Sequence, residues 1–363
     1  MSLHDSYHMS NAAGQKSSIC IVGVGAVTSV GLSAPATAAA VRGGISGFAE
    51  HPFMIDRQGE PIIVASVLNI GATTSGPNHL CDLTARALRE AALPLEPHCC
   101  DAGRIATFVG LPPQRPGRAA DLESRLVDAL RQIAGISSVE CIATGHSAGL
   151  MALEAVSRNV VANPTGLYLA GGVDSYLEPE TMDWLEGNDQ LHGGPNAFGF
   201  MPGEAAGFCL VCSEQVAQRF DLPVLARLWT GATAREENLI KTDTVCLGKG
   251  LTEVFRKVFA QLPATTERID HIICDMNGEP YRADEYGFSI ARLSQRFEDA
   301  SAFIAPADCW GDVGAASGPL FVNLVVAAGQ RGYAKARYNL VWTSSESGER
   351  SAAILQNELS VRN

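Results

Sequence analysis

The sequence lacks the features that would direct it to a membrane or to nucleic acid. No apolar segment approaches the roughly 20 residues that a membrane-spanning helix requires, and there is no run of lysine or arginine. Only 18% of the 363 residues are charged, and 39 acidic residues against 27 basic ones leave a net charge of -12. Phosphate backbones and anionic lipids repel such a charge. We therefore expect neither nucleic acid nor a membrane as the main partner.

Targeting, metal and cofactor motifs are missing as well. Residues 1–17 are polar, without the basic start and apolar core of a signal peptide, which predicts a flexible leader and a cytoplasmic protein. The ten cysteines are scattered, as buried thiols in a reducing compartment are. Cys209 and Cys212 have C-x-x-C spacing but lie in an apolar run typical of a strand, whose alternation points them to opposite faces. Gly23 and Gly25 lack the third glycine of a dinucleotide loop. We expect no metal and no cofactor.

Apolar runs that alternate with helix-like segments are the main feature of the chain. Such an alternation predicts an α/β protein whose parallel sheets have helices on both sides. The expected strands are residues 18–31, 104–110, 167–174, 222–233 and 268–275, with short strands within a loop at 48–78. The expected helices are residues 35–42, 83–92, 121–133, 248–261 and 314–328, and a buried helix that begins near residue 148.

The stretch from Glu140 to Val156 combines a short apolar run, a glycine-rich corner and a core helix. Such a corner places a side chain at a helix N-terminus, where free N–H groups favour negative charge. Gly145-His-Ser-Ala-Gly149 matches the G-x-S-x-G elbow of α/β-hydrolases, with Ser147 as the nucleophile. That fold also needs a later histidine, and only His192 and His271 follow Ser147. The hydrolase remains one alternative.

The longer frame from His146 to Leu153 resembles the active-site loop and helix of β-ketoacyl synthases in the thiolase superfamily, where a cysteine begins the run. Three further stretches resemble the same family: the glycine pattern from Gly23 to Gly31, the Ala170-Gly-Gly-Val-Asp174 strand, and the segment 198–211. The resemblance implies a five-layer αβαβα fold with two similar halves, which we expect at residues 18–215 and 216–363.

The family's Cys-His-His active site falls on three other residues here. His146 stands at the cysteine, Asn277 at the first histidine and Asp312 at the second. The resemblance also implies that Phe200 lies at the entrance of an acyl pocket. Glu279 and Gly348 are further candidates for contact with the substrate. An acidic Asp312 would repel the enolate that the two histidines stabilise in the family.

These replacements predict a ketosynthase-like protein that has lost decarboxylative condensation. It would bind an acyl group or an acyl carrier protein, or act beside an active synthase as chain-length-factor subunits do, and the resemblance implies a homodimer. An alternative is an acyltransferase or thioesterase in which a neutral His146 activates Ser147. The helix end would disfavour the imidazolium of His146. A further interpretation is that both residues only cap the helix and fill the old cavity.

Residues 277–287 crowd four charged side chains and two tyrosines into what we interpret as a loop. Two hypotheses follow. In the first, the loop is solvated and Arg282 pairs with Asp284 or Glu285. In the second, Glu279 or Arg282 enters the former active site and changes its ligand preference.

Overall fold

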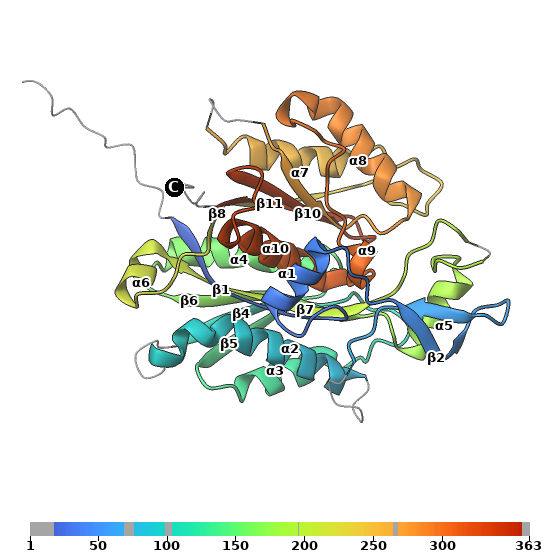
Figure 1. Cartoon of the computed structure of the whole chain (residues 1–363), viewed down its shortest axis with the longest axis horizontal. Helices are drawn as coiled ribbons and strands as arrows, with labels where there is room; N and C mark the ends of the chain where they lie inside the picture. Colours follow the sequence, from blue (N-terminus) through green and yellow to red (C-terminus); the bar gives the residue numbers. More distant parts are fainter. Residues whose placement is uncertain (1–17, 69–75, 99–103, 195, 264–267, 358–363) are drawn as a thin grey trace, which may run out of the picture.

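The computed structural model describes residues 18–68, 76–98, 104–194, 196–263 and 268–357. The expected leader, residues 1–17, lies outside these residues. The described chain forms five layers in the order helices, strands, helices, strands, helices (Figure 1). This αβαβα arrangement confirms the fold class that the sequence predicts.

Nine strands form one continuous sheet in the order β5-β4-β6-β7-β1-β8-β11-β10-β9. The first five belong to the N-terminal half and the last four to the C-terminal half. The halves join where residues 19–21 of β1 pair antiparallel with residues 226–228 of β8. The strands are β1 (Ile19–Thr28), β4 (Ile105–Gly110), β5 (Ile136–Ile142), β6 (Leu167–Ser175), β7 (Glu204–Ser213), β8 (Ala226–Arg235), β9 (His271–Cys274), β10 (Tyr338–Ser344) and β11 (Glu349–Gln356).

Strand pairing shows that the two halves share one plan, which no repeat in the sequence reveals. In the first half, β4 is parallel to β6, β6 is antiparallel to β7, and β7 is antiparallel to β1. In the second half, β9 is parallel to β10, β10 is antiparallel to β11, and β11 is antiparallel to β8. The expected boundary at residue 215 falls within the short helix α6 (Glu214–Arg219), which connects them.

The central layer consists of α4 (Ala148–Ala162) and α10 (Ser317–Gln330), each in contact with strands of both halves. The helices approach closely because each has a glycine at the contact. A Cβ on Gly149 would lie 2.4 Å from Cδ of Pro319, and one on Gly318 would lie 2.6 Å from Cγ of Leu150. Their contact brings the segment before α10 to the N-terminus of α4.

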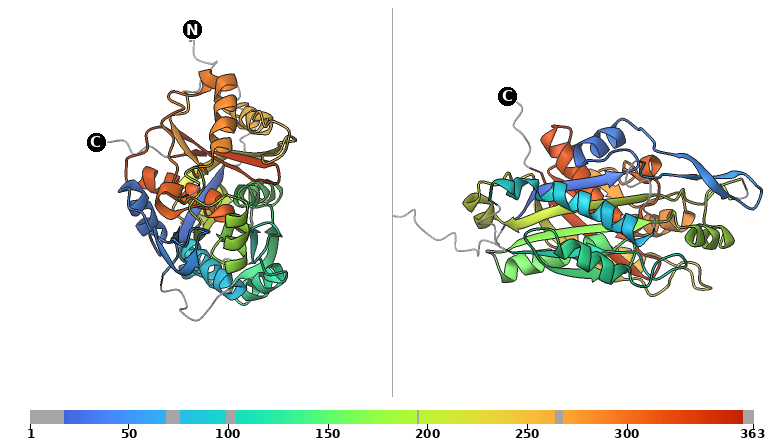
Figure 2. Two further views of the ribbon diagram at one scale, coloured as in Figure 1. Left: turned by 90° about the vertical axis from the view of Figure 1, so that its right-hand side faces the viewer. Right: turned by 90° about the horizontal axis from the view of Figure 1, so that it is seen from below.

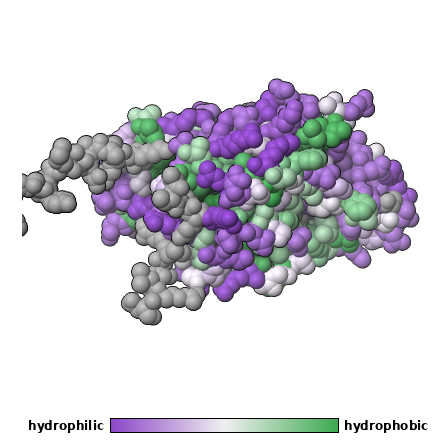
Figure 3. Space-filling view, turned by 90° about the horizontal axis from the view of Figure 1, so that it is seen from above, coloured by the Kyte–Doolittle hydropathy of each residue, from purple (hydrophilic) through white to green (hydrophobic). Residues whose placement is uncertain are grey.

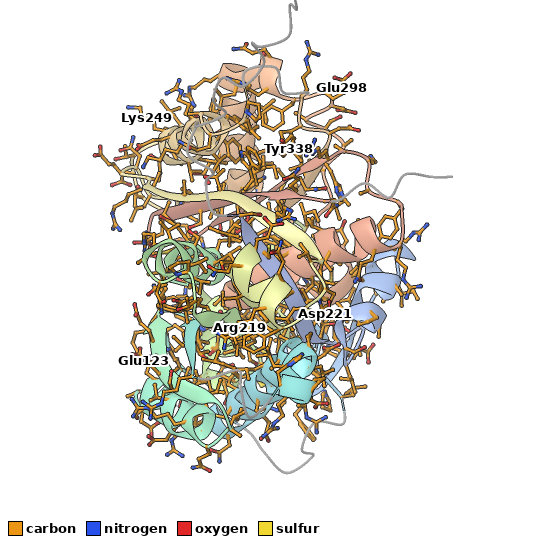
Figure 4. All side chains as sticks on the ribbon, turned by 90° about the vertical axis from the view of Figure 1, so that its left-hand side faces the viewer. Glu123, Arg219, Asp221, Lys249, Glu298 and Tyr338 are labelled. Carbon is orange, nitrogen blue, oxygen red and sulfur yellow. The ribbon has the colours of Figure 1, made fainter. Side chains whose placement is uncertain are left out.

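Two helix pairs form the outer layers. α2 (Pro77–Ala92) and α3 (Leu122–Arg131) cover the first half, while α7 (Lys249–Phe259) and α8 (Pro280–Leu293) cover the second. Glu123 of α3 and Lys249 of α7 lie toward opposite ends of this stack (Figure 4). The face of the molecule that is seen from above is largely hydrophilic, with hydrophobic patches spread across it (Figure 3).

The remaining elements connect or flank these layers. The hairpin of β2 (Ala49–Ile55) and β3 (Pro61–Val64) projects from one end of the molecule (Figure 2). The shorter helices are α1 (Ala34–Arg42), α5 (Pro179–Gly187) and α9 (Ala307–Trp310), with 3-10 turns η1 (Leu93–His98), η2 (Ser294–Arg296) and η3 (Gly314–Ala316). In the described part of the chain, no helix is both long and apolar enough to cross a bilayer.

Three sequence predictions need correction at element boundaries. Residues 280–287 are not a loop, because α8 begins at Pro280, and α2 likewise begins at Pro77 rather than at Leu83. A proline in the first helical turn gives up no intrahelical hydrogen bond, so Pro280 and Pro77 are both helix start signals in the sequence. The strand expected from Leu222 begins only after Pro223, which has no N–H for the ladder.

The alternation argument for the cysteine pair is confirmed. Both residues lie in β7, and their side chains enter different cores. Cys209 packs among the central helices, whereas Cys212 faces the outer layer of α2.

Candidate functional site

A glycine-dependent corner places His146 and Ser147 at the start of α4. The corner follows the end of β5 at Ile142, and Gly145 has a φ of +79°, a conformation that favours glycine. The N–H of Gly145 donates to the carbonyl of Leu111, and the N–H of Ala148 donates to the carbonyl of Gly145. The strand, elbow and helix therefore lie where the sequence predicts them.

His146 and Asp312 form a buried pair. Nε2 of His146 lies 2.8 Å from Oδ1 and 2.9 Å from Oδ2 of Asp312, and both side chains are buried. A lone pair on Nε2 would face the carboxylate unfavourably at these distances. Nε2 therefore carries a proton and donates it to Asp312.

The Asp312 carboxylate receives two more hydrogen bonds. Asn277 Nδ2 donates to Oδ2 at 2.6 Å, and the N–H of Gly314 donates to Oδ1 at 2.9 Å. Burial alone would raise the pKa of Asp312, but His146, with Arg282 and the N–H of Gly314, holds that pKa well below its usual value. Asp312 is therefore an anion that only accepts hydrogen bonds. Three predicted site residues, His146, Asn277 and Asp312, meet at this point.

Arg282 is the nearest cation to this group, and it is fully buried. Its Nη1 donates to Asp275 Oδ2 at 2.9 Å and to the carbonyl of Ser344 at 3.0 Å, while Nη2 lies 3.2 Å from Nε2 of His146. The hypothesis of a solvated pair with Asp284 or Glu285 is wrong. Arg282 instead lies beside His146, as the second hypothesis places it, and a changed ligand preference stays a prediction.

The charge of His146 differs from what the helix end alone suggests. Burial lowers its pKa, and the Arg282 cation lowers it further, but the Asp312 carboxylate outweighs both and raises that pKa above its usual value. Asp312 therefore favours the charged imidazolium of His146, in the direction opposite to the one expected from the helix end. The nearby carboxylate exceeds the effect of the helix end, which is only a partial charge.

Ser147 does not take part in this group. Its hydroxyl donates to the carbonyls of Glu349 at 2.9 Å and Thr343 at 3.2 Å, and its N–H donates to Oγ of Ser345 at 2.8 Å. The side chain is fully buried against the β10–β11 turn. It therefore anchors the helix start to the second half of the molecule and has no contact with His146 that would activate it.

A cavity of about 200 Å³ opens beside His146. Its walls come from the elbow, the segment after β4, the end of β6, α5 and the β10–β11 turn. They are formed by Pro113, Gln114, Arg115, Thr144, Gly145, His146, Tyr176, Trp184, Leu185, Gln190, Phe200, Asp312, Glu346 and Ser347. Phe200 thus lines the cavity, and its ring packs edge-on against Tyr176 with centroids 5.3 Å apart.

Glu279 and Gly348, the other predicted substrate contacts, have other roles in the structure. Glu279 accepts from Tyr281 at 2.9 Å and from Asn277 at 3.1 Å. Gly348, at a φ of +111°, shapes the β10–β11 turn, and its N–H donates to the carbonyl of Ser345. Neither residue is among those that line the cavity.

Sequence reasoning missed Arg115 and Tyr176. Arg115 lies 4.1 Å above the Tyr176 ring, and its Nη2 donates to Asp174 and to the carbonyl of Ser175, each at 2.6 Å. Both residues follow the carboxyl ends of the neighbouring parallel strands β4 and β6. Ligands commonly bind at such strand ends, and this was the signal available in the sequence.

Two other features lie apart from this site. A hollow of about 480 Å³ between α1 and α10 includes none of the predicted site residues. Glu236, Cys246 and Glu285 lie within 4.8 Å of one another, as metal ligands would. The Glu236 carboxylate accepts a hydrogen bond from the N–H of Gly250, and the Glu285 carboxylate accepts hydrogen bonds from Arg350 and Ser344. This cluster is therefore accounted for by hydrogen bonds within the protein.

No protein-family model matches the sequence, and no curated protein matches it. Solved structures do. A type II polyketide ketosynthase in complex with its acyl carrier protein is 15% identical, with a TM-score of 0.78, and the match covers 95% of this chain and 100% of that one. The ishigamide ketosynthase/chain length factor is 15% identical, with a TM-score of 0.77, and the match covers 94% of this chain and 99% of that one. The module 6 ketosynthase of the Bacillus subtilis 168 bacillaene synthase is 14% identical, with a TM-score of 0.76, and the match covers 94% of this chain and 72% of that one. At this identity the likeness shows the fold: the chain has the thiolase-like ketosynthase fold.

Proposed function

We propose that this chain is a ketosynthase-like protein that does not perform decarboxylative condensation and that binds a short acyl group beside His146. The observation that carries the proposal is the buried hydrogen bond between Nε2 of His146 and the Asp312 carboxylate. The resemblance gives the position of His146 to the nucleophilic cysteine. The acyl group would arrive on an acyl carrier protein or another thioester.

Condensation requires a nucleophile to hold one acyl group and donors to stabilise the enolate of the other. Nε2 of His146 is committed to Asp312, and Ser147 is committed to two main-chain carbonyls. Asp312 accepts hydrogen bonds instead of donating them, and the amide of Asn277 is turned toward Asp312 and Glu279. The group therefore offers an enolate a negative charge where donors are needed.

The cavity supports the binding of a small, partly apolar ligand. The lining includes the apolar side chains of Trp184, Leu185 and Phe200. The volume of about 200 Å³ is below the roughly 300–1,000 Å³ typical of ligand pockets. We therefore assign it a short acyl chain rather than a long one.

A partner is the second part of the proposal. One structural neighbour is a ketosynthase in complex with an acyl carrier protein, and another is a ketosynthase/chain length factor. In this chain β5 ends the sheet, with β4 as its one neighbour in the described residues. An open edge can pair with another chain. We propose a dimer through this edge, with a second copy or with an active ketosynthase. The cytoplasmic location stays a prediction.

The other two sequence hypotheses are not proposed. A Ser147 nucleophile, whether in an acyltransferase or in an α/β-hydrolase, needs an adjacent base, and the Ser147 hydroxyl instead donates to two carbonyl oxygens.

The test measures condensation and binding separately. Purified protein is incubated with malonyl- and acetyl-pantetheine, and CO2 release is followed beside an intact ketosynthase as the positive control. We expect no CO2 release above background. Calorimetry with acetyl and dodecanoyl thioether analogues is expected to show saturable binding of the acetyl compound alone. Release of CO2, or no binding of the acetyl analogue, would contradict the proposal.

A further inference from the structure

The imidazole of His146 has one nitrogen that the protein does not use. Nε2 donates to Asp312, whereas Nδ1 has no hydrogen-bond partner among the described residues. Nδ1 is not fully enclosed by protein atoms, so it is open to accessible space. The accessible space beside His146 is the cavity. An imidazole fixed by a carboxylate at one nitrogen and open at the other has the arrangement of a general base.

The cavity also contains a hydrogen-bond donor without a protein acceptor. The hydroxyl of Tyr176 has no hydrogen-bond partner in the described part of the chain, although the residue is only 7% exposed. Burial, with the carboxylates of Asp312 and Asp174, holds the pKa of Tyr176 well above its usual value. The phenol therefore keeps its proton and can donate to a carbonyl oxygen.

We propose that His146, positioned by Asp312, is the general base of a thioester hydrolase that acts on short acyl groups in this cavity, with Tyr176 as the donor to the carbonyl oxygen. The inference rests on the proposed function, since the acyl group must first bind beside His146. It differs from the Ser147 hypothesis because water, and not a side chain, is the nucleophile.

The chemical step balances without a further reactant. Nδ1 of neutral His146 takes a proton from water, and the water oxygen bonds to the thioester carbonyl carbon. The carbonyl oxygen gains negative charge, which the Tyr176 hydroxyl stabilises. When the carbon–sulfur bond breaks, the sulfur takes the proton from Nδ1. The products are a carboxylic acid and a thiol, and His146 returns to its neutral form.

The first arm of the test compares variants with acetyl-pantetheine, and thiol release is measured. We expect turnover by the wild type and a loss of about 100-fold or more in His146→Gln. Tyr176→Phe keeps the ring beneath Arg115 and is expected to lower kcat by about 100-fold. His192→Gln removes an exposed histidine outside the cavity and should keep full activity. Melting temperatures show whether each variant is folded.

The second arm measures the pH dependence of kcat. Because the base is the neutral imidazole, kcat should rise as the pH increases through the pKa of His146. The charged groups that act on the ring are Asp312, Arg282, Asp275 and Glu346. Asp312→Asn removes the one that raises the pKa most, so the rise should move to lower pH, which a purely structural role of Asp312 would not cause.

The outcomes separate this inference from the proposed function. Binding of the acetyl thioether without hydrolysis of the thioester overturns the general base and leaves the proposed function standing. Hydrolysis that survives in His146→Gln, or an acyl adduct on His146 in mass spectra, also overturns it. Release of CO2 from the malonyl thioester contradicts the proposed function instead.

Discussion

Nε2 of His146 lies within 2.9 Å of both carboxylate oxygens of Asp312, although the two residues are 166 positions apart in the chain. His146 belongs to the N-terminal half, at the start of α4, and Asp312 to the C-terminal half, just before α10. Their contact therefore exists only when the central helices are packed together. A buried ion pair of this kind is costly to break from one side, since the remaining charge loses its partner without regaining water.

Asp312→Ala is expected to lower the free energy of unfolding by about 3–5 kcal/mol, because His146 and Arg282 lose the buried carboxylate that stabilises their charge. Chemical denaturation measures the change. The matched control is Glu253→Ala, which removes an exposed pair with Lys257 and should cost about 0.5 kcal/mol or less. Equal effects of the two substitutions would mean that the Asp312 pair adds no more than a surface pair does.

Arg282→Leu is expected to destabilise the protein by a similar amount, about 3–5 kcal/mol, since Asp275 would stay buried without its partner. Asp284→Asn, two residues along the same helix, changes an exposed side chain and should have an effect within about 0.5 kcal/mol. Thermal and urea unfolding compare the two. A large effect of Asp284→Asn with a small one of Arg282→Leu would restore the solvated pair that the structure contradicts.

The sequence predicted well where local pattern decides the structure. The runs that became β1, β6 and β7 are almost wholly apolar, and the glycine corner before α4 needs the positive φ that Gly145 adopts. These features depend on neighbouring residues alone. The alternation of strands and helices indicated an α/β protein, whereas the five-layer order was implied by the resemblance to ketosynthases.

The charged group was less predictable because distant pairing decides it. Arg282 reaches Nε2 of His146 across 136 positions, and Arg115 reaches Asp174 across 59. Polar residues after a strand look like a solvated loop until the fold shows what they face. The proline that begins α8 was a local clue, but the burial of Arg282 had no local signal.

Ser147→Ala is expected to leave acyl binding and thioester hydrolysis unchanged, because the hydroxyl points to the carbonyls of Thr343 and Glu349. The same change should lower stability by about 1 kcal/mol, since one buried hydroxyl hydrogen bond is lost while the Glu349 carbonyl keeps the N–H of Ser345 as a donor. Calorimetry, thiol release and urea unfolding give the three quantities. Ser157→Ala on the same helix is the control, because its hydroxyl bonds locally to the carbonyl of Glu154. Loss of hydrolysis with unchanged stability would assign Ser147 the nucleophile's role after all.

His146→Cys is expected to gain a covalent acyl adduct without gaining condensation. A thiol at the N-terminus of α4 can accept an acyl group, but Asp312 and Asn277 still offer no donor pair to an enolate. Mass spectrometry after incubation with acetyl-pantetheine detects the adduct, and CO2 release from the malonyl thioester reports condensation. His146→Ser carries a weaker nucleophile and should form little adduct. Decarboxylation by the cysteine variant would show that Asp312 does not block the reaction.

Stability should depend on pH in two opposite directions through the His146–Asp312 pair. The pKa of Asp312 is held below its usual value of 3.8, so its contribution is present above that pH and fades as the pH falls toward the folded pKa. The pKa of His146 is raised above its usual value of 6.5, so its contribution is complete below that pH and is lost as the pH rises through the folded pKa. The difference in unfolding free energy between the wild type and Asp312→Asn should therefore be largest between these two values. Urea titrations from pH 3 to 9 measure it, with Asp284→Asn as the control. A difference that stays constant up to pH 9 would mean that folding does not raise the pKa of His146.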